Sequence, residues 1–199
     1  MRIVLIGMRM EHFESSSYCE RAKQGDVSVF TTLLRSSDEK MRALAYRLVQ
    51  DRTAMEDVLQ ASYLKAYRGL ASFRGDSAFE SWLYSIVYRS CLDHLKQSKS
   101  NRAESLDSHG HREAASPTNP GDVDLAADVA DRLTLEDALA KLPVEQRAAV
   151  WLVDAQGFSF GQAAEVLDLP TGTVGSRVSR GRRSLRAALG QTSDKEAQT

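Results

Sequence analysis

The stretch GFSFGQAAEVLDLPTGTVGSRVSRGRRSLR, residues 157–186, contains two helix signals separated by a tight turn. Ser159 and Gln162 stand at the spacing of a capping box, which predicts a short helix that runs from this point to Leu167. The tripeptide Asp168-Leu169-Pro170 is typical of a turn, and Thr171 or Thr173 would cap a last helix to about Leu189. Two helices joined by such a turn predict a helix-turn-helix.

The last predicted helix has two chemically different faces. One face, which we expect to pack on the preceding helices, carries Val174, Val178, Gly181 and Leu185. The rest is polar, and residues 170–190 hold five arginines and no acidic residue. Arginines bind phosphates and guanine edges, and short hydroxyl side chains permit close approach to a duplex. The alternative is a solvated basic helix. We predict that DNA contacts come from Thr171, Thr173, Ser176, Arg177, Arg180 and Arg183.

Gly175 interrupts the polar part of this helix. Glycine inside a helix costs about 1 kcal/mol relative to alanine. Either it lets the backbone come close to DNA, or it weakens the site.

Upstream, aromatic residues and cations are interleaved between Tyr63 and Arg89. Aromatic rings stack on unpaired bases, and nearby cations neutralise the phosphates. We expect Phe79, Trp82 and Leu83 to face inward at least in part, and the loop at residues 72–77 to be the nucleic-acid surface.

Other segments also predict helices. One follows the Gly25-Asp26 break, with an interruption left open near residues 36–38. Capping boxes at Thr53–Glu56 and Ser77–Glu80 predict two more. The last of these has a column of apolar residues spaced four apart: Leu83, Val87, Cys91 and Leu95. We therefore expect Cys91 to be a small buried residue rather than a reactive thiol.

Between Asn101 and Arg132 the chain carries seven acidic residues against three arginines and is rich in Ser, Asn, Gly and Pro. This composition predicts a flexible acidic linker. The fold class is therefore all-α, with two small helical domains joined by that linker. The predicted segments are a disordered or wrongly assigned start (1–15), an N-terminal domain (16–98), the linker (99–130), a C-terminal domain (131–190) and a disordered tail (191–199).

Composition limits the remaining function classes. The chain of 199 residues has a net charge of -1 and two cysteines, too few for a disulfide framework, so a reducing cytoplasm fits best. His109 and His111 lack further ligands at metal spacing, and no nucleotide-binding or nucleophile motif is present. We expect no enzyme activity, no metal, no cofactor, no small-molecule substrate and no membrane insertion.

The order of these parts resembles the extracytoplasmic-function (ECF) sigma factors of bacterial RNA polymerase. Three stretches carry the resemblance: AKQGDVSVFTTLL, LAYRLVQDRTAMEDVLQASYLKAYRGLASFRGDSAFESWLYSIVYRSCLDHL and LPVEQRAAVWLVDAQGFSFGQAAEVLDLPTGTVGSRVSRGRRSLR. They cover roughly residues 22–95 and 142–186. Against the family pattern, Ala61 replaces an acidic residue, Ala163 a larger aliphatic residue, Ser85 a basic residue, Arg89 an asparagine and Gly175 a lysine.

The resemblance implies a transcription initiation factor that binds core polymerase at its clamp and flap regions, directs it to promoters and helps open the strands. It implies promoter DNA, duplex and single-stranded, and an anti-sigma factor as partners. The core-polymerase residues would be Asp57, Gln60, Leu64, Lys65 and Arg68. The minus-ten and melting residues would be Phe73, Arg74, Asp76, Ser77, Phe79, Trp82, Tyr88 and Arg89. The predicted helix-turn-helix would read the minus-thirty-five element.

Two rival hypotheses come from other classes. A stand-alone helix-turn-helix regulator would explain residues 158–189 but would leave the upstream motifs without a role. An adhesion ligand would display Arg74-Gly75-Asp76 outside the cell, but the chain shows no convincing signal peptide.

Overall fold

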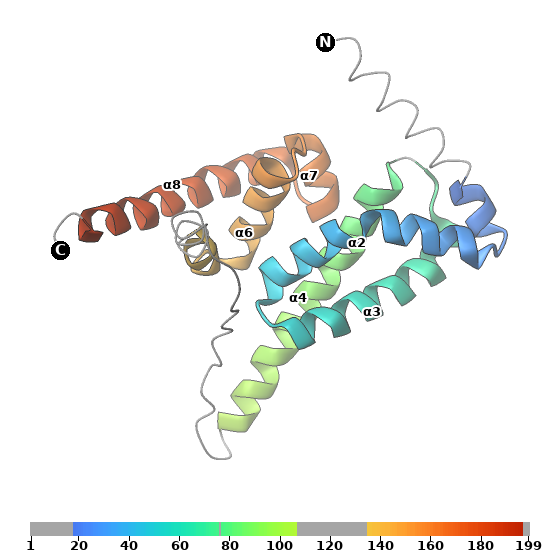
Figure 1. Ribbon diagram of the computed structural model, residues 1–199, viewed down its shortest axis with the longest axis horizontal. Helices are drawn as coiled ribbons and strands as arrows, with labels where there is room; N and C mark the ends of the chain where they lie inside the picture. Colours follow the sequence, from blue (N-terminus) through green and yellow to red (C-terminus); the bar gives the residue numbers. More distant parts are fainter. Residues whose placement is uncertain (1–17, 76, 107–134, 197–199) are drawn as a thin grey trace, which may run out of the picture.

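The structure, a computed structural model, describes residues 18–75, 77–106 and 135–196, and all regular secondary structure in these ranges is helical. Residues 18–23 and 135–140 form short helical segments. The other elements are α2 (Val27–Val49), α3 (Arg52–Gly69), the 3-10 turn η1 (Leu70–Ser72), α4 (Phe79–Leu106), α6 (Val144–Val150), the π-helical turn η2 (Trp151–Ala155), α7 (Phe160–Leu167) and α8 (Thr171–Glu196) (Figure 1).

The all-helical prediction is confirmed, but two helices continue past the expected domain ends. α4 reaches Leu106 and α8 reaches Glu196. Most of the predicted linker and the predicted start lie outside the described residues. The segment boundaries drawn from the sequence therefore stay predictions.

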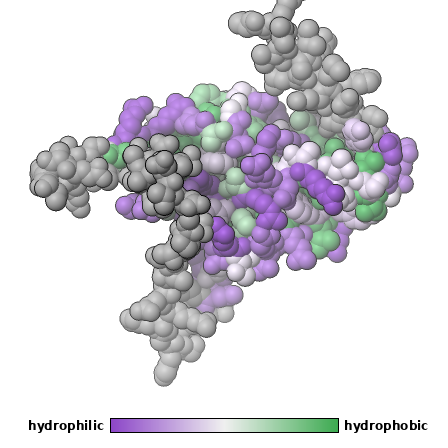
Figure 2. All heavy atoms as spheres, in the orientation of Figure 1, coloured by the Kyte–Doolittle hydropathy of each residue, from purple (hydrophilic) through white to green (hydrophobic). Residues whose placement is uncertain are grey.

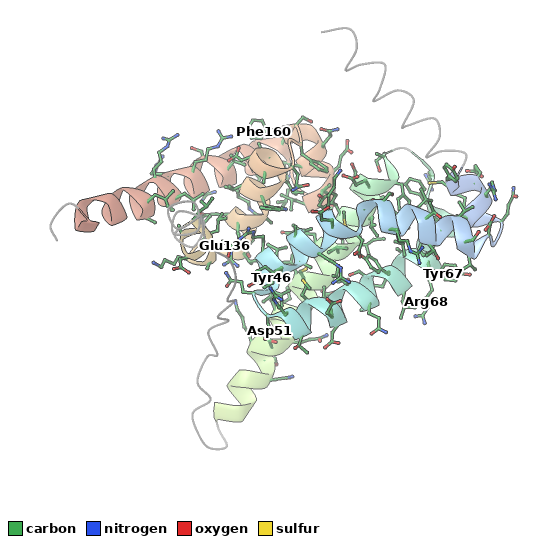
Figure 3. All side chains as sticks on the ribbon, viewed as in Figure 1. Tyr46, Asp51, Tyr67, Arg68, Glu136 and Phe160 are labelled. Atoms are coloured by element: carbon green, nitrogen blue, oxygen red, sulfur yellow. The ribbon has the colours of Figure 1, made fainter. Side chains whose placement is uncertain are left out.

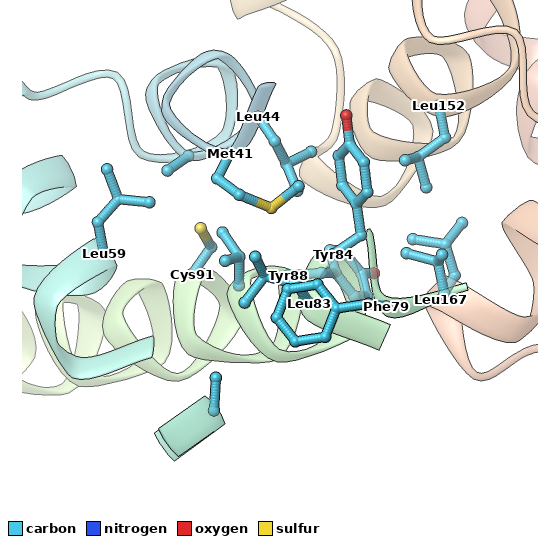
Figure 4. Packing of buried hydrophobic residues seen from close by; sticks show 14 of the residues in the cluster. Met41, Leu44, Leu59, Phe79, Leu83, Tyr84, Tyr88, Cys91, Leu152 and Leu167 are labelled. Atoms are coloured by element: carbon cyan, nitrogen blue, oxygen red, sulfur yellow. The ribbon is translucent and has the colours of Figure 1, made fainter. Parts of the chain in front are cut away.

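The core of the N-terminal domain lies between α2, α3 and α4. Met41 and Leu44 on α2 and Leu83 on α4 are fully buried (Figure 4). Val87 on α4 is fully buried as well. Burial of each such side chain stabilises the fold by about 1.5–3 kcal/mol. Cys91 belongs to the same core, as predicted, and burial raises the pKa of its thiol to about 12. At neutral pH this thiol is protonated and unreactive.

Two features of α2 and α3 differ from the sequence prediction. α2 is continuous through residues 36–38. The helix accommodates both serines: the Ser36 hydroxyl donates to the Leu33 carbonyl at 2.8 Å, and Ser37 is buried against the core. The capping box at Thr53 was wrong. Asp51 is the N-cap of α3, and its carboxylate accepts from the Ala54 backbone N–H at 2.7 Å. Aspartate with extended backbone is among the best N-caps, so the helix starts earlier.

The predicted helix-turn-helix is confirmed, but its second helix starts differently from the prediction. Both bonds of the Ser159–Gln162 capping box are present, at 3.2 and 2.9 Å. Asp168 ends α7 in the left-handed conformation, with φ 56°. The Pro170 carbonyl accepts from the Thr173 and Val174 N–H groups, so the chain enters α8 from Pro170 and neither threonine is the cap.

The two domains pack directly against each other. α4 packs on α7 and α2 packs on α6, so that buried residues of both domains form one continuous hydrophobic cluster. Figure 1 shows α6 and α7 lying against the domain formed by α2, α3 and α4. Figure 4 shows Tyr84 of α4 in the same view as Leu152 and Leu167 of the C-terminal domain. This direct packing was not predicted.

Candidate functional site

Four of the five predicted core-polymerase residues form an exposed strip along α3. Asp57, Gln60, Leu64 and Arg68 are all exposed, and their spacing of three or four places them on one helix face. Leu64 is 52% exposed, with charged and amide groups on both sides. Lys65 instead turns toward α4, where it donates to Ser90 Oγ at 3.1 Å and lies 3.6 Å from Asp93. We call Asp57, Gln60, Leu64 and Arg68 the α3 strip.

The neighbouring Tyr67 is also exposed, at 44%. Figure 3 shows Tyr67 and Arg68 side by side on the N-terminal domain, away from Phe160 of the C-terminal domain. The face seen in Figure 2 is mostly hydrophilic, with small scattered hydrophobic areas. The α3 strip together with the neighbouring Tyr67 therefore has the composition of a protein-binding surface of moderate hydrophobicity.

A groove of about 620 Å³ lies beside the start of the α3 strip, between α2 and α3. An ion-pair network forms one edge: Arg42 binds Asp38 at 2.7 Å and also binds Glu56, and the Tyr63 hydroxyl donates to Asp38 at 2.7 Å. Partial burial opposes ionisation of Asp38, but these hydrogen bonds outweigh it and lower its pKa. The network fixes α3 against α2. Sequence reasoning missed it, although the i,i+4 spacing of Asp38 and Arg42 was a signal.

The minus-ten candidates surround an aromatic cluster. Phe73 is 7% exposed, and its ring lies 5.0 Å from Trp82 and 6.1 Å from Phe79, between centroids. Phe79 is buried and Trp82 is half-buried, as expected from the sequence. Phe73 was expected to be part of the loop surface, but it packs inward because both neighbouring rings offer apolar contact.

A shallow pocket of about 340 Å³ opens on this cluster. Its lining residues are Ser72, Phe73, Arg74, Gly75, Ser77 and Trp82. The rings of Phe73 and Trp82 supply an aromatic wall, and the exposed Arg74 stands at its edge. Gly75 has φ +80°, a left-handed conformation that glycine adopts without strain. Asp76 lies outside the described residues.

On α8, the minus-thirty-five candidates are mostly exposed. Thr171, Ser176, Arg180 and Arg183 are exposed, and Thr173 is half-buried. Arg180 lies along the helix, where it donates to the Ser176 hydroxyl at 3.0 Å and to the Ser176 carbonyl at 3.2 Å. Arg183 lines a separate hollow that also includes Phe160, Arg182 and Arg186. The polar face therefore presents cations and hydroxyls together, as a duplex requires.

Three predicted DNA residues meet where the domains touch. Arg89 of α4 lies 3.6 Å from Asp168, and Tyr88 of α4 is buried with Arg177 of α8 beside it. These residues line one groove between α4 and the helix-turn-helix. Burial is the main cause that raises the pKa of the Tyr88 hydroxyl, and the Arg177 guanidinium opposes it. Sequence reasoning assigned these side chains to different promoter elements and did not foresee their contact.

The structure gives no sign of a metal centre or a membrane span in the part of the chain that it describes. Residues 18–75, 77–106 and 135–196 contain no group of three or more metal-ligating side chains. No helix of these ranges combines the length and apolar character needed to cross a bilayer.

Comparison with known proteins identifies the class. The family model for Sigma-70 region 2 matches residues 33–101, and that for Sigma-70 region 4 matches residues 132–185. These matches cover the α3 strip, the aromatic pocket and the helix-turn-helix. The domain order is therefore that of a sigma-70-type initiation factor.

Individual relatives narrow the class to one family. The chain is 38% identical over 166 residues to the ECF RNA polymerase sigma factor SigM of Mycobacterium tuberculosis, covering 83% of this chain and 80% of the relative. It is 32% identical over 182 residues to the ECF RNA polymerase sigma-E factor of Haemophilus influenzae, covering 86% and 93%. The chain belongs to the ECF sigma factors of RNA polymerase, which direct core RNA polymerase to promoters.

Solved structures agree with this assignment. The sigma factor RpoE of Bartonella quintana, solved in complex with the anti-sigma factor NepR, is 28% identical with a TM-score of 0.65, covering 81% of this chain and 96% of that chain. CnrH, solved with the cytosolic domain of CnrY, shares the fold at a TM-score of 0.63 and 24% identity, covering 89% and 97%.

Proposed function

We propose that the α3 strip, the aromatic pocket and the polar face of α8 each carry out a different step of promoter recognition and opening. The α3 strip, assisted by Lys65, binds the polymerase clamp. The aromatic pocket, with Arg74 and Ser77 at its rim, holds an unpaired base of the minus-ten element. The polar face of α8 binds the minus-thirty-five duplex, with Ser176 and Arg180 at its centre.

One observation carries this division: two chemically different DNA surfaces lie on two different domains. The pocket at residues 72–82 combines aromatic rings with one cation, which suits a single base because every base offers a face for stacking. The α8 face combines several arginines with hydroxyls, which suits a duplex groove. A stand-alone regulator needs only the second surface.

The likeness to RpoE, which was solved with an anti-sigma factor, supports an anti-sigma factor as a further partner of this chain. We propose that the chain acts in the cytoplasm, where core polymerase and DNA are found. It would carry no catalysis of its own, since phosphodiester synthesis belongs to the polymerase.

The variant Arg74→Ala, assayed in reconstituted transcription with core polymerase, tests whether the aromatic pocket acts in strand opening. Loss of the cation beside the base pocket should slow strand opening about tenfold while binding of the closed duplex stays near wild type. Permanganate footprints of the melted region measure opening, and gel shifts at low temperature measure closed binding. Phe73→Ala is a poorer probe, because removal of a buried ring costs about 3–5 kcal/mol of stability.

Arg180→Ala is the matched control, since it removes one exposed arginine from the other DNA surface. It should weaken closed binding and leave the fraction of bound complexes that open unchanged. Footprints of wild-type strength in Arg74→Ala would remove the loop from the melting site.

A further inference from the structure

The first helical segment, residues 18–23, lies against one wall of the aromatic pocket. Its Cys19 and Ala22 side chains are buried in the core of the N-terminal domain, so the segment has a fixed position in that domain. Lys23 is the last residue of the segment, and its Nζ lies over the Phe73 ring, 5.8 Å from the ring centre. Phe73 in turn lines the pocket. A cation from the start of the chain therefore lies beside the pocket.

The Lys23 side chain is held by two partners. Only 20% of it is exposed, and the Phe73 ring attracts its ammonium group electrostatically. The same Nζ donates to Glu20 Oε1 at 2.7 Å, one helical turn earlier in the chain. A lysine ammonium has three donors, and Glu20 accepts from one of them. The group can therefore bind a further anion without leaving its place beside Phe73.

Arg74 is a second cation at the same ring. It follows Phe73 directly in the chain, is exposed and lines the pocket. Lys23 and Arg74 thus approach the pocket from two different elements. A single DNA strand carries one phosphate for every nucleotide, so a base that enters the pocket brings negative charge with it. Sites for single strands combine aromatic rings that stack on bases with cations that follow the backbone. One aromatic wall with two cations has this composition.

We propose that Lys23 is a phosphate-binding residue of the aromatic pocket, and that Glu20 holds its ammonium group beside Phe73 until single-stranded DNA binds. The proposal rests on the base-binding function proposed above for the pocket. Glu20 is 63% exposed, and an ion pair with an exposed partner contributes little to stability. A phosphate can therefore replace Glu20 as the partner of Lys23, and the Glu20 carboxylate competes with DNA for this cation.

Binding of single-stranded DNA to the full-length chain in complex with core polymerase tests the role of Lys23. The probe is an oligonucleotide with the non-template sequence around a start site mapped for the wild-type complex. Lys23→Met keeps a long side chain but removes its charge. It should weaken binding about fivefold and reduce the slope of log K against log salt by about 0.7, the value for one phosphate contact on a single strand. Lys23→Arg keeps the charge and should keep the wild-type slope.

Glu20→Gln tests the competition between the carboxylate and DNA. It should tighten binding of the same probe about threefold in the wild-type chain, because Lys23 then has no carboxylate partner within its segment. In the Lys23→Met background the same substitution should have little effect, since the two residues act as a pair. Tightening of equal size in both backgrounds would show that Glu20 repels DNA independently of Lys23, which would contradict the proposed competition.

Arg21→Met is the matched control. Arg21 belongs to the same segment, but residues two apart on a helix do not face each other, and Arg21 binds Asp26 at 2.7 Å. The substitution removes the same charge as Lys23→Met and should change the affinity by less than about twofold. Equal losses of affinity and slope in the two variants would reduce the role of Lys23 to its contribution to the net charge.

The salt slope separates phosphate binding from a structural role. If Lys23 only supported the Phe73 ring, Lys23→Met would weaken binding and leave the slope at its wild-type value, and this result would overturn the proposal. If Arg74→Ala reduces the slope and Lys23→Met does not, the base pocket stands and only the role of Lys23 falls. If the wild-type complex does not bind the single-stranded probe, the proposed function of the pocket itself is wrong.

Discussion

At the residue scale, the two glycines of α8 have opposite structural roles. A Cβ atom on Gly181 would lie 2.6 Å from Val150 Cγ2, so this position lets α8 approach α6 closely. Around Gly175 nothing lies within 4 Å of the corresponding point. The packing of the free chain therefore does not require glycine there, and only a close approach of DNA to the backbone would. A side chain at residue 175 fits the fold, whereas one at residue 181 does not.

Arg180 is the exposed arginine that we propose at the centre of the DNA-binding face of α8. Arg180→Ala should weaken binding of the holoenzyme to a minus-thirty-five duplex by about tenfold. Because one phosphate contact is lost, the slope of log K against log salt should fall by about 0.9. Fluorescence anisotropy across a salt series measures both quantities.

Arg182→Ala is the control for this prediction, since Arg182 is bound to Asp154 through Nε at 3.0 Å. It should change the affinity by less than about twofold. An Arg180 variant with the salt dependence of wild type would exclude Arg180 from the DNA interface.

At the element scale, helix starts depend on which polar side chain reaches the first free N–H groups. For α7 the capping box indicated by Ser159 and Gln162 is the one that forms. For α3 Asp51 takes the position that Thr53 was expected to take. Several capping residues close together in sequence compete, and packing of the helix on the core selects among them. The capping and apolar patterns in the sequence therefore predicted which segments are helical, but they did not always predict the residue at which a helix starts.

The N-cap of α2 leads to a prediction about pH. Hydrogen bonds from Ser28, Arg21 and the Val29 backbone lower the pKa of Asp26 from 3.8 to about 2. A carboxylate whose pKa is lower in the folded state stabilises the fold above its unfolded pKa. This stabilisation is lost as the pH falls from about 4 through about 2.

Urea midpoints between pH 2 and pH 6 measure this effect. Asp26→Asn keeps a good cap but cannot ionise, so its midpoint should fall less steeply than that of wild type between pH 4 and pH 2. If the urea midpoints of the two proteins fell in parallel with pH, the ionised Asp26 carboxylate would not contribute to the stability of the fold.

At the scale of the whole molecule, the continuous core couples the stability of the two domains. Tyr84 of α4 is fully buried and contacts Phe158 and Gln156 of the C-terminal domain. The chain has two tryptophans, Trp82 in the N-terminal domain and Trp151 in the C-terminal domain. Each can report the unfolding of its own domain.

Tyr84→Ala should therefore lower the urea midpoint reported by Trp151 as well as that reported by Trp82. The expected total loss is about 3 kcal/mol, as for other large buried aromatic residues. Trp82→Phe and Trp151→Phe backgrounds separate the two signals. Tyr67→Ala, an exposed tyrosine on α3, is the control and should leave the Trp151 transition in place. A Trp151 midpoint unaffected by Tyr84→Ala would mean that the domains unfold independently.

Local and periodic information in the sequence determined the helices, the helix-turn-helix and the buried position of Cys91, because capping residues and apolar spacing act within a few residues along the chain. The residues of the α3 strip were implied by the resemblance to ECF sigma factors. Only the tertiary structure decided that Phe73 and Tyr88 are buried and that Arg89 and Arg177 line one groove. It also decided that Arg147 caps a helix of the other domain, a hundred residues away. These contacts depend on complementary surfaces brought together from distant parts of the chain, and no spacing within either helix encodes them.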